Sequence, residues 1–570
     1  MRHLASFAAA CVLFAAAHEV AAGGLELLPP GARSVARGGA VAARPEDPLA
    51  LLHNPAGLAF LSGSQVIVGA DAPLHHMCVT PYGYYGWGIY GAGSSEFGDP
   101  LAVDNPSMPT IGANYATTPL GQVCNSARVV PIPQLAVMTK ITDDIAIGGG
   151  LVAPLVVAGL QYGGTDGTQQ TPYGPRPTPT RYSIIAQDAD FALAPSIGGA
   201  YRVLPELSFG INVQIAMLKA NTTMVQNNFG GTQPSTDWLV KIKAQDFFTP
   251  SITFAVHARP RPQLNLMGAF RWVDNFRGTG ELTYETNTFH RGATAGPVPY
   301  QNPPVKLSDV VVRLPWQITM GARYAGLLPD VDCEPGPGDP MDTELWDIEL
   351  DLGYSLNARA SNTSASIGQD VTVVTRTAGG GAGSNTVPLK DLAAFDIDHH
   401  LKDSASVRLG GSYAVLPRKL VVHAGGFFES RGVDPAYADI DAFAFQRVGV
   451  GVGLVVRLGS FDLQGAYGHI FSETLDVAPP PHQAVDNAVA GDPRSGFDKR
   501  VGGSIGSNGS RVGGVVLDDP KAPALGNADA VAAKTQQSAV VTPYQPNRVI
   551  NAGKYEARFD VVSVGVVYHF

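Results

Sequence analysis

The C-terminal residues 555–570 alternate between large apolar side chains and smaller or polar ones. Counted back from the end, one parity carries Phe570, Tyr568, Val566, Val564 and Val562, and the other includes His569, Gly565 and Ser563. A period of two predicts a β-strand with one apolar face. Because an uncovered apolar strand at the edge of a soluble sheet invites aggregation, the pattern favours a lipid-facing strand of a closed barrel.

The N-terminal residues 1–22 have the features of a secretory signal peptide. Arg2 and His3 precede an apolar stretch from Leu4 to Ala17, and small residues follow before Gly23. The alternative, a membrane anchor, is less favoured because this stretch is shorter than the roughly 20 residues that a spanning helix needs. We therefore expect export and a mature chain that begins near Gly23.

Composition restricts how the exported chain can enter a membrane. After the leader, no run of about 18 uncharged apolar residues occurs, which excludes a helical bundle. The 66 glycines, 44 prolines and 15% charged residues are typical of many short strands separated by turns. The formal net charge of -10, without a cluster of Lys and Arg, gives no reason to expect nucleic-acid binding.

Four cysteines are present, and Cys11 lies in the leader. Cys78 and Cys124 flank one loop-like stretch, and export to an oxidising compartment makes a disulfide between them possible. The alternative is that the two thiols stay apart. Cys333 lies alone in an acidic segment rich in Pro and Gly.

From Gln65 onward the chain divides into about fourteen segments with a period of two. Five of their connections are short: Thr142 to Asp144, Val203 to Pro205, Arg259 to Pro262, Pro417 to Arg418, and Gly459 to Ser460. The long connections include residues 72–132, 157–189, 359–403 and 472–554. Short periplasmic turns and long extracellular loops are typical of outer-membrane barrels. We predict an all-β, transmembrane antiparallel β-barrel of about 14 strands over residues 65–570.

Within single strands, one parity is apolar and the other is charged or polar. In one example, Trp346, Ile348, Leu350, Leu352 and Tyr354 alternate with Asp347, Glu349, Asp351 and Ser355. If the apolar parity faces lipid, the charges line the lumen. A soluble β-sandwich would reverse the two faces, but the apolar C-terminus and the alternating connection lengths favour the barrel.

Residues 23–64 do not alternate and are rich in small side chains. They contain Ala36-Arg37-Gly38-Gly39-Ala40, the acidic Asp47 and Asn54-Pro55-Ala56-Gly57-Leu58-Ala59. Asn54 could hold a backbone turn through its side chain, and Pro55 fixes φ. We expect a small domain of short helices; a flexible linker is the alternative.

These motifs resemble those of the outer-membrane long-chain fatty-acid transporter family, FadL, and its TodX-type relatives for aromatic hydrocarbons. The resemblance implies that residues 23–64 form a hatch, or plug, inside the barrel, with Asn54, Pro55 and Ala56 as its motif. It also aligns residues 142–154 with the family's second turn and third strand, whose kink opens the wall sideways. Pro154 is the candidate for this kink, because proline cannot donate to the strand ladder; the alternative is that the strand simply ends there.

A transporter of this type would capture a hydrophobic molecule at the cell surface. The candidate aromatic contacts are Tyr82, Tyr84, Tyr85 and Trp87, although these side chains could instead pack on one another. The inward-parity arginines that could bind a carboxylate are Arg271, Arg313, Arg408 and Arg447. Most of them could also pair with luminal acids.

The functional expectation is passage of hydrophobic molecules across the outer membrane, with long-chain fatty acids ahead of aromatic hydrocarbons. The alternative is a structural or adhesive barrel that acts through its long loops. No enzyme is expected: Gly502 to Gly506 matches a nucleophile-elbow spacing but lies in a loop rich in Gly and Ser. No cofactor or metal is expected. The expected partners are the hydrophobic substrate, outer-membrane lipid and, for the C-terminal strand, the barrel-assembly machinery, and we expect a monomer with periplasmic termini.

Overall fold

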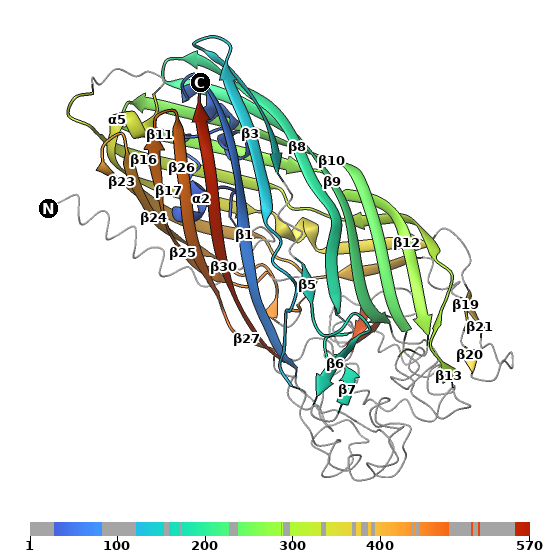
Figure 1. The fold of residues 1–570 in the computed structure, drawn as a ribbon. Helices are drawn as coiled ribbons and strands as arrows, with labels where there is room; N and C mark the ends of the chain where they lie inside the picture. The colour runs from blue at the N-terminus through green and yellow to red at the C-terminus, as the bar shows by residue number, and fades with distance from the viewer. Residues whose placement is uncertain are drawn as a thin grey trace.

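A computed structural model gives the fold of the chain (Figure 1). It describes residues 28–81, 121–152, 159–171, 174–181, 183–226, 238–286, 288, 297–331, 338–367, 372–374, 376–377, 386–388, 394–435, 438–440, 444–477, 503–505, 511–513 and 553–570. The expected signal peptide and the aromatic candidates Tyr82, Tyr84, Tyr85 and Trp87 lie outside these residues, as does Pro154. None of the helices in the described ranges is long and apolar enough to cross a bilayer.

The described strands form a closed antiparallel barrel of 14 strands, as the sequence predicts. Ten wall strands are continuous: β1 (Ser64–Pro81), β3 (Ile132–Lys140), β4 (Ile145–Val152), β8 (Ala186–Leu204), β9 (Leu207–Gln226), β10 (Trp238–Arg261), β24 (Leu420–Glu429), β25 (Arg447–Leu458), β26 (Phe461–Ser472) and β30 (Gly553–His569). β30 pairs with β1 from Gln65 opposite His569 to Pro81 opposite Gly553, which closes the wall.

The other four wall strands are each divided into two pieces. In chain order these pieces are β11 (Leu264–Val273) with β12 (Phe276–Thr286), β15 (Val305–Val312) with β16 (Gln317–Leu327), β17 (Glu344–Ser355) with β18 (Asn362–Ile367), and β22 (Ala394–Asp398) with β23 (Ser404–Leu416). The sequence predicted single strands over residues 263–278 and 310–324, so it missed the interruptions at residues 274–275 and 313–316.

Shorter elements complete the described structure. They are β2 (Val123–Cys124), β5 (Leu160–Gln161), β6 (Thr168–Thr171), β7 (Gly174–Pro177), β13 (Pro297–Val298), β14 (Tyr300–Gln301), β19 (Thr372–Val374), β20 (Arg376–Thr377), β21 (Thr386–Pro388), β27 (Leu475–Val477), β28 (Gly503–Ile505), β29 (Arg511–Gly513), α2 (Ala32–Ala36), α3 (Ala50–His53), η1 (Pro55–Phe60), α5 (Pro340–Thr343) and η3 (Asn357–Ala360). β1 runs to Pro81, well past the expected end at Asp71, so part of the predicted 72–132 loop is strand.

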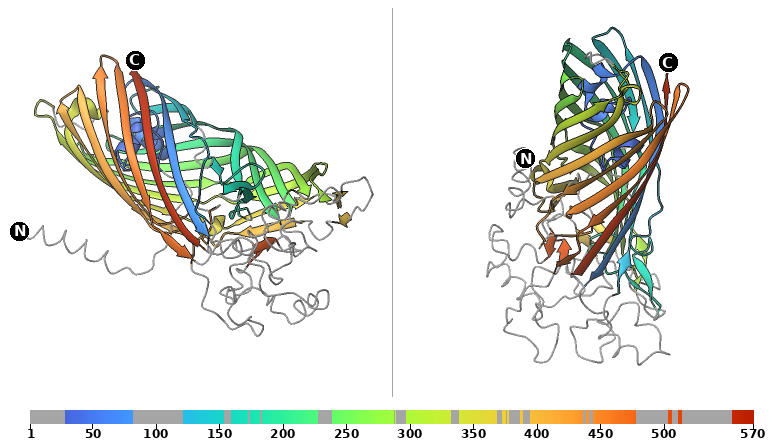
Figure 2. Two further views of the ribbon diagram at one scale, coloured as in Figure 1. Left: turned by 60° about the horizontal axis from the view of Figure 1, so that its bottom comes forward. Right: turned by 90° about the vertical axis from the view of Figure 1, so that its left-hand side faces the viewer.

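The barrel has two unlike ends. One end carries the C-terminus and short connections such as residues 141–144, 205–206 and 459–460; we call it the turn end. The opposite end carries the long connections, and we call it the loop end. Figure 2 shows β9, β10 and β12 extending far toward the loop end.

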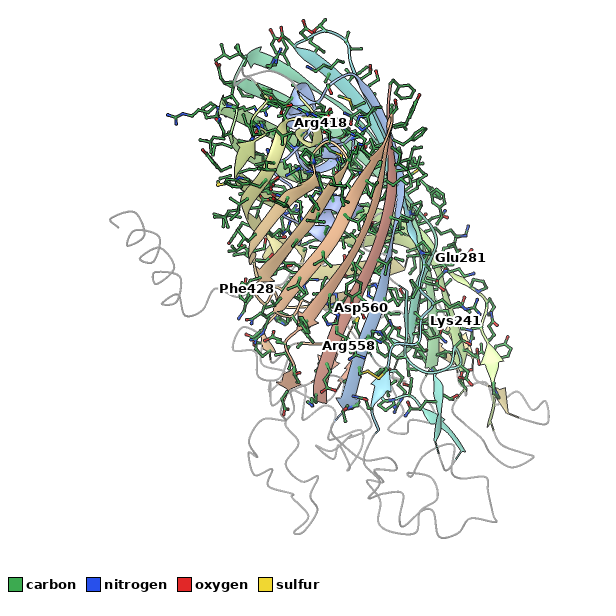
Figure 3. The ribbon with its side chains drawn as sticks, turned by 60° about the vertical axis from the view of Figure 1, so that its left-hand side comes forward. Lys241, Glu281, Arg418, Phe428, Arg558 and Asp560 are labelled. Atoms are coloured by element: carbon green, nitrogen blue, oxygen red, sulfur yellow. A yellow bond between two sulfur atoms is a disulfide. The ribbon has the colours of Figure 1, made fainter. Side chains whose placement is uncertain are left out.

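The outer surface of the turn-end half is apolar. On β30, Val562, Val564 and Val566 are exposed and Phe570 is 72% exposed, while Val567 and Ser563 are buried. The same outward parity on other strands exposes Ile197, Phe254, Met320, Leu350, Val452 and Phe428, the last of which Figure 3 labels. This apolar belt makes the barrel a transmembrane one, since such an area would not stay exposed to water.

The two faces of β10 exchange their character at a bulge. Near the turn end, Ser251 and Thr253 are buried inside and Phe254 is 51% exposed outside. Near the loop end, Val240 is buried inside, and Lys243 is exposed outside. The pairing with β9 shifts between Asp246 and Thr249, so the neighbours Phe247 and Phe248 both point outward, at 50% and 67% exposed. One extra residue moves every later side chain to the opposite face.

Charged side chains continue across the outer face beyond this bulge. Cross-strand pairing places Asp188, Asn221, Lys243, Glu281 and Lys306 in one row over five strands, with charges of alternating sign. Figure 3 shows the neighbouring Lys241 and Glu281 on this face. Such a row suits water rather than lipid. The apolar belt therefore ends at Phe247 and Phe248, and the loop-end part of these strands projects beyond the bilayer.

Inside the barrel, the loop-end half is apolar. Trp238, Val240, Leu282, Tyr284 and Leu307 form one buried cluster on β10, β12 and β15. On the opposite side of the lumen, residues of the connection after β24, including Val433 and Phe445, pack against β1, β26 and β30.

The position of the apolar belt predicts different losses of stability for an arginine introduced at two outward positions of β10. Phe254→Arg, in the apolar belt, should lower the free energy of unfolding by about 2–4 kcal/mol, because an arginine on the lipid face has to be desolvated. Gln245→Arg, outward on the same strand but beyond the bulge, should change it by less than about 1 kcal/mol. Urea unfolding in lipid vesicles measures both. Equal losses would contradict the assigned boundary.

Candidate functional site

Residues 28–63, which we call the luminal segment, lie inside the turn-end half of the barrel. α2 contacts β24, β25, β26 and β30, whereas η1 contacts β4, β8, β9 and β10 on the opposite wall. Figure 2 shows these short helices within the ring of strands. Almost every residue from Ala32 to Phe60 is buried. The segment therefore touches the wall on opposite sides of the lumen.

Ion pairs fix the middle of the luminal segment to β17. Arg37 is fully buried, with Nη1 2.8 Å from Oδ1 of Asp347 and Nη2 2.8 Å from Oε2 of Glu349. Arg44 also pairs with Asp347, as does Arg323 of β16. Buried charges need partners of this kind, because removal of one partner costs about 3–5 kcal/mol.

Backbone amides of the segment donate hydrogen bonds to carboxylates of the same strand, β17. The amide nitrogen of Ala42 donates to Oδ2 of Asp351 at 2.9 Å, and that of Ala43 donates to Oε1 of Glu349 at 2.6 Å. The three carboxylates of β17 thus bind the part of the segment that lies between α2 and α3. The sequence placed these acids in the lumen but did not identify the arginines of residues 28–63 as their partners.

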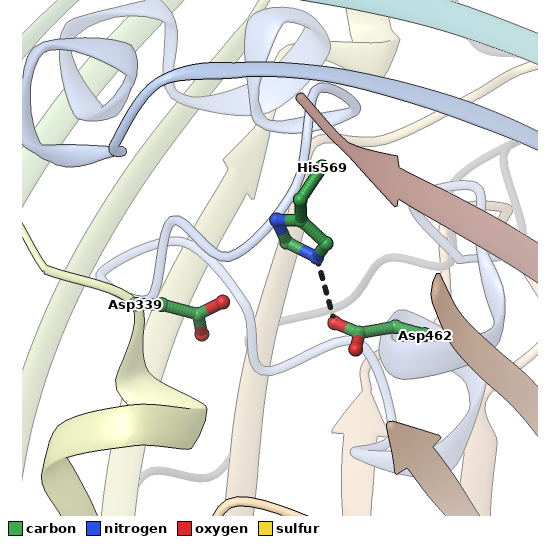
Figure 4. Close-up of side chains that lie close together, drawn as sticks. All are labelled: Asp339, Asp462 and His569. Atoms are coloured by element: carbon green, nitrogen blue, oxygen red, sulfur yellow. Dashed lines mark hydrogen bonds and ion pairs between the residues drawn. The ribbon is translucent and has the colours of Figure 1, made fainter. Parts of the chain in front are cut away.

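A second ionic cluster joins the beginning of the segment to the turn end of the wall. Arg457 donates to Oδ2 of Asp339 at 2.5 Å and to Oδ1 of Asp462 at 2.7 Å, and Nη2 of Arg33 lies 3.2 Å from Asp462. Nε2 of His569 lies 3.0 Å from the same carboxylate (Figure 4). Asp339, Asp462 and His569 are residue types that bind metals, but the two guanidinium groups account for both carboxylates. We interpret the cluster as an ion-pair network.

The Asn54-Pro55-Ala56 motif fixes the other end of the segment. Asn54 is fully buried; its Oδ1 accepts from the amide of Gly57, which caps η1, and its Nδ2 donates to the carbonyl of Ala42 at 2.7 Å. Nδ2 also lies 2.9 Å from Nδ1 of His257 on β10. Ser208 on β9 donates to the carbonyl of Ala56 at 2.8 Å. The motif therefore connects two parts of the segment to two wall strands.

Glycines on the inner wall make room for the segment backbone. A Cβ atom on Gly451 would lie 1.9 Å from the carbonyl oxygen of Val35, and one on Gly210 would lie 2.2 Å from the amide nitrogen of Ala56. Neither position can hold a larger side chain without displacing the segment. Gly451 and Gly453 of β25 are thus part of the surface on which α2 packs.

A cavity of about 230 Å³ lies directly over the luminal segment. Its floor includes Pro29, Val41, Leu52 and His53, and its sides come from strands around the barrel. Apolar side chains, among them Val152, Ala216, Val273, Leu314 and Ile318, supply much of the lining. Thr249, Ser251 and Thr253 add hydroxyl groups from β10. The cavity lies at the level of the β10 bulge.

Two of the four candidate arginines reach this cavity. Arg271 and Arg408 line it, together with the acids Asp351 and Glu429. Nε of Arg408 is buried and has no hydrogen-bond partner within the described ranges. The other two candidates lie elsewhere: Arg447 pairs with Glu429 at 2.8 Å, and Arg313 is exposed between β15 and β16.

His53 contributes a neutral side chain to the floor of the cavity. Burial, together with the nearby positive charge of Arg408, lowers its pKa to about 4. At neutral pH the imidazole is therefore uncharged, which leaves Arg408 and Arg271 as the cationic groups of the lining.

Within the described residues, the strand pairing between β1 and β8 is interrupted beside the cavity. β4 ends at Val152 and β3 begins at Ile132, and both residues line the cavity. Beyond them toward the loop end, the short strands β2 and β5 pair with β1 and β8 respectively. Cys78 of β1 and Cys124 of β2 form a disulfide at the loop-end border of this gap. The sequence suggested the disulfide but could not show that it frames a break in the wall.

Comparison with known proteins identifies the fold. No protein-family model matches the chain, and no curated protein matches it by sequence. Its structure is similar to that of a FadL homologue from Pseudomonas aeruginosa, with a TM-score of 0.58, 12% identity, and coverage of 97% of this chain and 99% of that one. It is also similar to the toluene transporter TodX of P. putida, with a TM-score of 0.53, 12% identity, and coverage of 96% and 99%. At such low identity the similarity shows a shared fold.

A side chain at Gly451 would occupy the space in which α2 packs, and it should therefore displace the luminal segment. Gly451→Val places methyl groups where the Val35 carbonyl lies, so the segment should be displaced and the barrel should conduct ions in a planar bilayer more than the native protein does. Gly465→Val on β26 is the matched control, since a Cβ there meets nothing within 4 Å. If both variants conduct like the native barrel, the segment does not close the lumen.

Proposed function

We propose that the protein transports hydrophobic molecules across the outer membrane, and that long-chain fatty acids are the favoured class. The observation that carries this proposal is the cavity between the luminal segment and a break in the barrel wall. A molecule held there has the segment on one side and lipid beyond the gap on another. In this proposal, the segment is a hatch that blocks direct passage of water and ions.

The cavity is large enough to hold part of a long-chain ligand. A cavity of about 150 Å³ can hold one benzene ring, so 230 Å³ admits a ring or a portion of an alkyl chain. Each buried CH₂ contributes about 0.8 kcal/mol. A long chain would therefore gain affinity in the cavity, with the rest of its length extending into the gap between β1 and β8.

The two arginines in the cavity lining favour a ligand with an acidic headgroup. Arg408 points inward from β23, and its buried Nε lacks a hydrogen-bond partner within the described ranges. An arginine can bind a carboxylate strongly, through two parallel charge-assisted hydrogen bonds. We propose Arg408 as the residue that binds the headgroup, with Arg271 on the other side of the cavity. Aromatic hydrocarbons are the alternative substrates, because the apolar lining accepts them without using either arginine.

The break between β1 and β8 provides the proposed way out. β4 ends two residues before Pro154, and proline cannot continue the strand ladder, so we propose Pro154 as the cause of the lateral opening.

The turn end faces the periplasm in this arrangement, with both termini there, and the C-terminal strand is the signal for the barrel-assembly machinery. The protein acts as a monomer and is not an enzyme. Nothing within the described ranges favours the alternative adhesive role.

Substitution of Arg408 distinguishes the two substrate classes. Arg408→Met should reduce uptake of a radiolabelled long-chain fatty acid about tenfold or more, since a hydrogen bond to a charged group contributes about 1.5–3 kcal/mol. Uptake of toluene should stay within about twofold, because a neutral ring makes no such bond. Arg277→Met, at an exposed outward position on β12, is the matched control.

The assay uses cells that lack the native gene and express each variant at equal surface levels. Equal loss of fatty acid and toluene uptake would show that Arg408 has a structural role. Failure of the native protein to support uptake of either compound would contradict the proposed function itself.

A further inference from the structure

Four neighbouring wall strands are interrupted at the same height. On the turn-end side of the interruption, Arg271, Gln317, Ser355 and Ser404 form the last paired row. On the loop-end side, pairing resumes with Phe276, Val312, Thr363 and Ile397. Between these rows lie residues 274–275, 313–316, 356–361 and 399–403, which belong to no wall strand. The regular strand pairing that closes a barrel in lipid is interrupted here, and single backbone hydrogen bonds remain, from Leu356 to the carbonyl of Trp316 and from His399 to that of Ser361.

The cavity extends into this interruption. Leu314 and Pro315, which lie between β15 and β16, are part of its lining. So are Ile318 and Tyr354, which are 36% and 41% exposed and belong to the outward parity of β16 and β17. Because residues of the interruption itself and of the adjoining strand ends line it, the cavity reaches the break in the strand pairing. Because Val152 and Ala194 line its other side, the cavity spans the lumen from one break in the wall to the other.

One aromatic side chain covers this second break. The indole Nε1 of Trp316 donates to the carbonyl of Val273 at 3.0 Å, and its ring meets the outward Phe270 edge-on at 6.0 Å between centroids. The guanidinium carbon of Arg359 lies 4.1 Å from the Trp316 ring centroid, and Nη1 of Arg359 donates to the carbonyl of Leu314. Arg359 thus contacts the Trp316 ring and also binds the carbonyl of Leu314, which lies outside the paired strands.

The break lies at the edge of the apolar belt. The amide of Asp274 donates to the carbonyl of Pro250 at 2.9 Å, which places the interruption beside Phe247 and Phe248. On the turn-end side the outward residues include Phe270 and Met320, and on the loop-end side they include Glu281 and Lys306. A molecule dissolved in the outer leaflet would meet the break where the acyl chains end and the headgroups begin.

We propose that this interruption is a second lateral port, through which hydrophobic molecules already dissolved in the outer leaflet enter the cavity. Trp316 is its gate, and Arg359 is the latch that keeps the gate closed. The port rests on the proposed function, since it serves the same cavity, but it is separate from the gap between β1 and β8. Arg313 and Arg359 both lie at its mouth and interact electrostatically, with Asp274 as the nearby acid. The mouth therefore favours amphiphiles with an acidic headgroup.

Thiol labelling from the lipid phase tests the port without a transport assay. Leu314→Cys is introduced in a Cys333→Ser background, where Cys78 and Cys124 remain in their disulfide. The protein is reconstituted in lipid vesicles and treated with a long-chain alkyl maleimide. Adding Trp316→Ala or Arg359→Ala should speed labelling of the new cysteine about fivefold to tenfold, the shift in an opening equilibrium expected from loss of one cation–π contact.

Two controls make each outcome decisive. Met320→Cys, at an outward position that is 58% exposed, must react quickly and shows that the reagent reaches the belt. Trp346→Ala removes another outward tryptophan, which packs against Tyr324, and should leave labelling at position 314 unchanged. The proposal is overturned if Trp316→Ala and Arg359→Ala both leave the rate as it is, or if Trp346→Ala raises it equally.

The same variants separate this proposal from the proposed function. Faster labelling with no fatty-acid uptake by the native protein would support the port and contradict the transport proposal. Native uptake with labelling that does not depend on Trp316 would support transport and contradict the port.

Discussion

The ion pairs between the luminal segment and β17 are the interaction on which the arrangement of the lumen depends. Arg37 and Arg44 are both buried, and the carboxylates of Asp347 and Glu349 are their partners. Because buried charges are tolerated only when paired, the segment has one position in the barrel. That position fixes where the wall needs glycine, as at Gly451, and it provides the floor of the cavity.

The reversal of inner and outer character along β10 is the second constraint. The bulge at Phe247 and Phe248 ends the lipid-facing surface and turns the apolar parity inward. An apolar molecule that leaves the outer leaflet at this height therefore moves from one apolar surface to another. The cavity and both breaks in the wall lie at the same level, so a change of strand register and the gaps in the ladder together define the proposed pathway.

The sequence allowed the barrel to be predicted because period-two alternation and connection lengths are local signals. It also identified the role of Asn54 in a backbone turn, and Arg408 as an inward residue. It did not predict the partners of Arg37, since ion pairs across hundreds of residues leave no local pattern. It missed the interruption at Arg313 to Trp316, because the apolar parity continues through residues that do not pair. The bulge at Phe247 was missed for the same reason.

The central claim is that the cavity over the luminal segment holds a hydrophobic molecule. The direct measurement is mass spectrometry of what co-purifies with the protein extracted from its native membrane in polymer-bounded lipid discs, compared with an Ala269→Trp variant whose cavity is filled. The account predicts one hydrophobic species enriched over bulk lipid with the native protein and lost from the variant. The same lipid profile in both samples, with no enriched species, would contradict it.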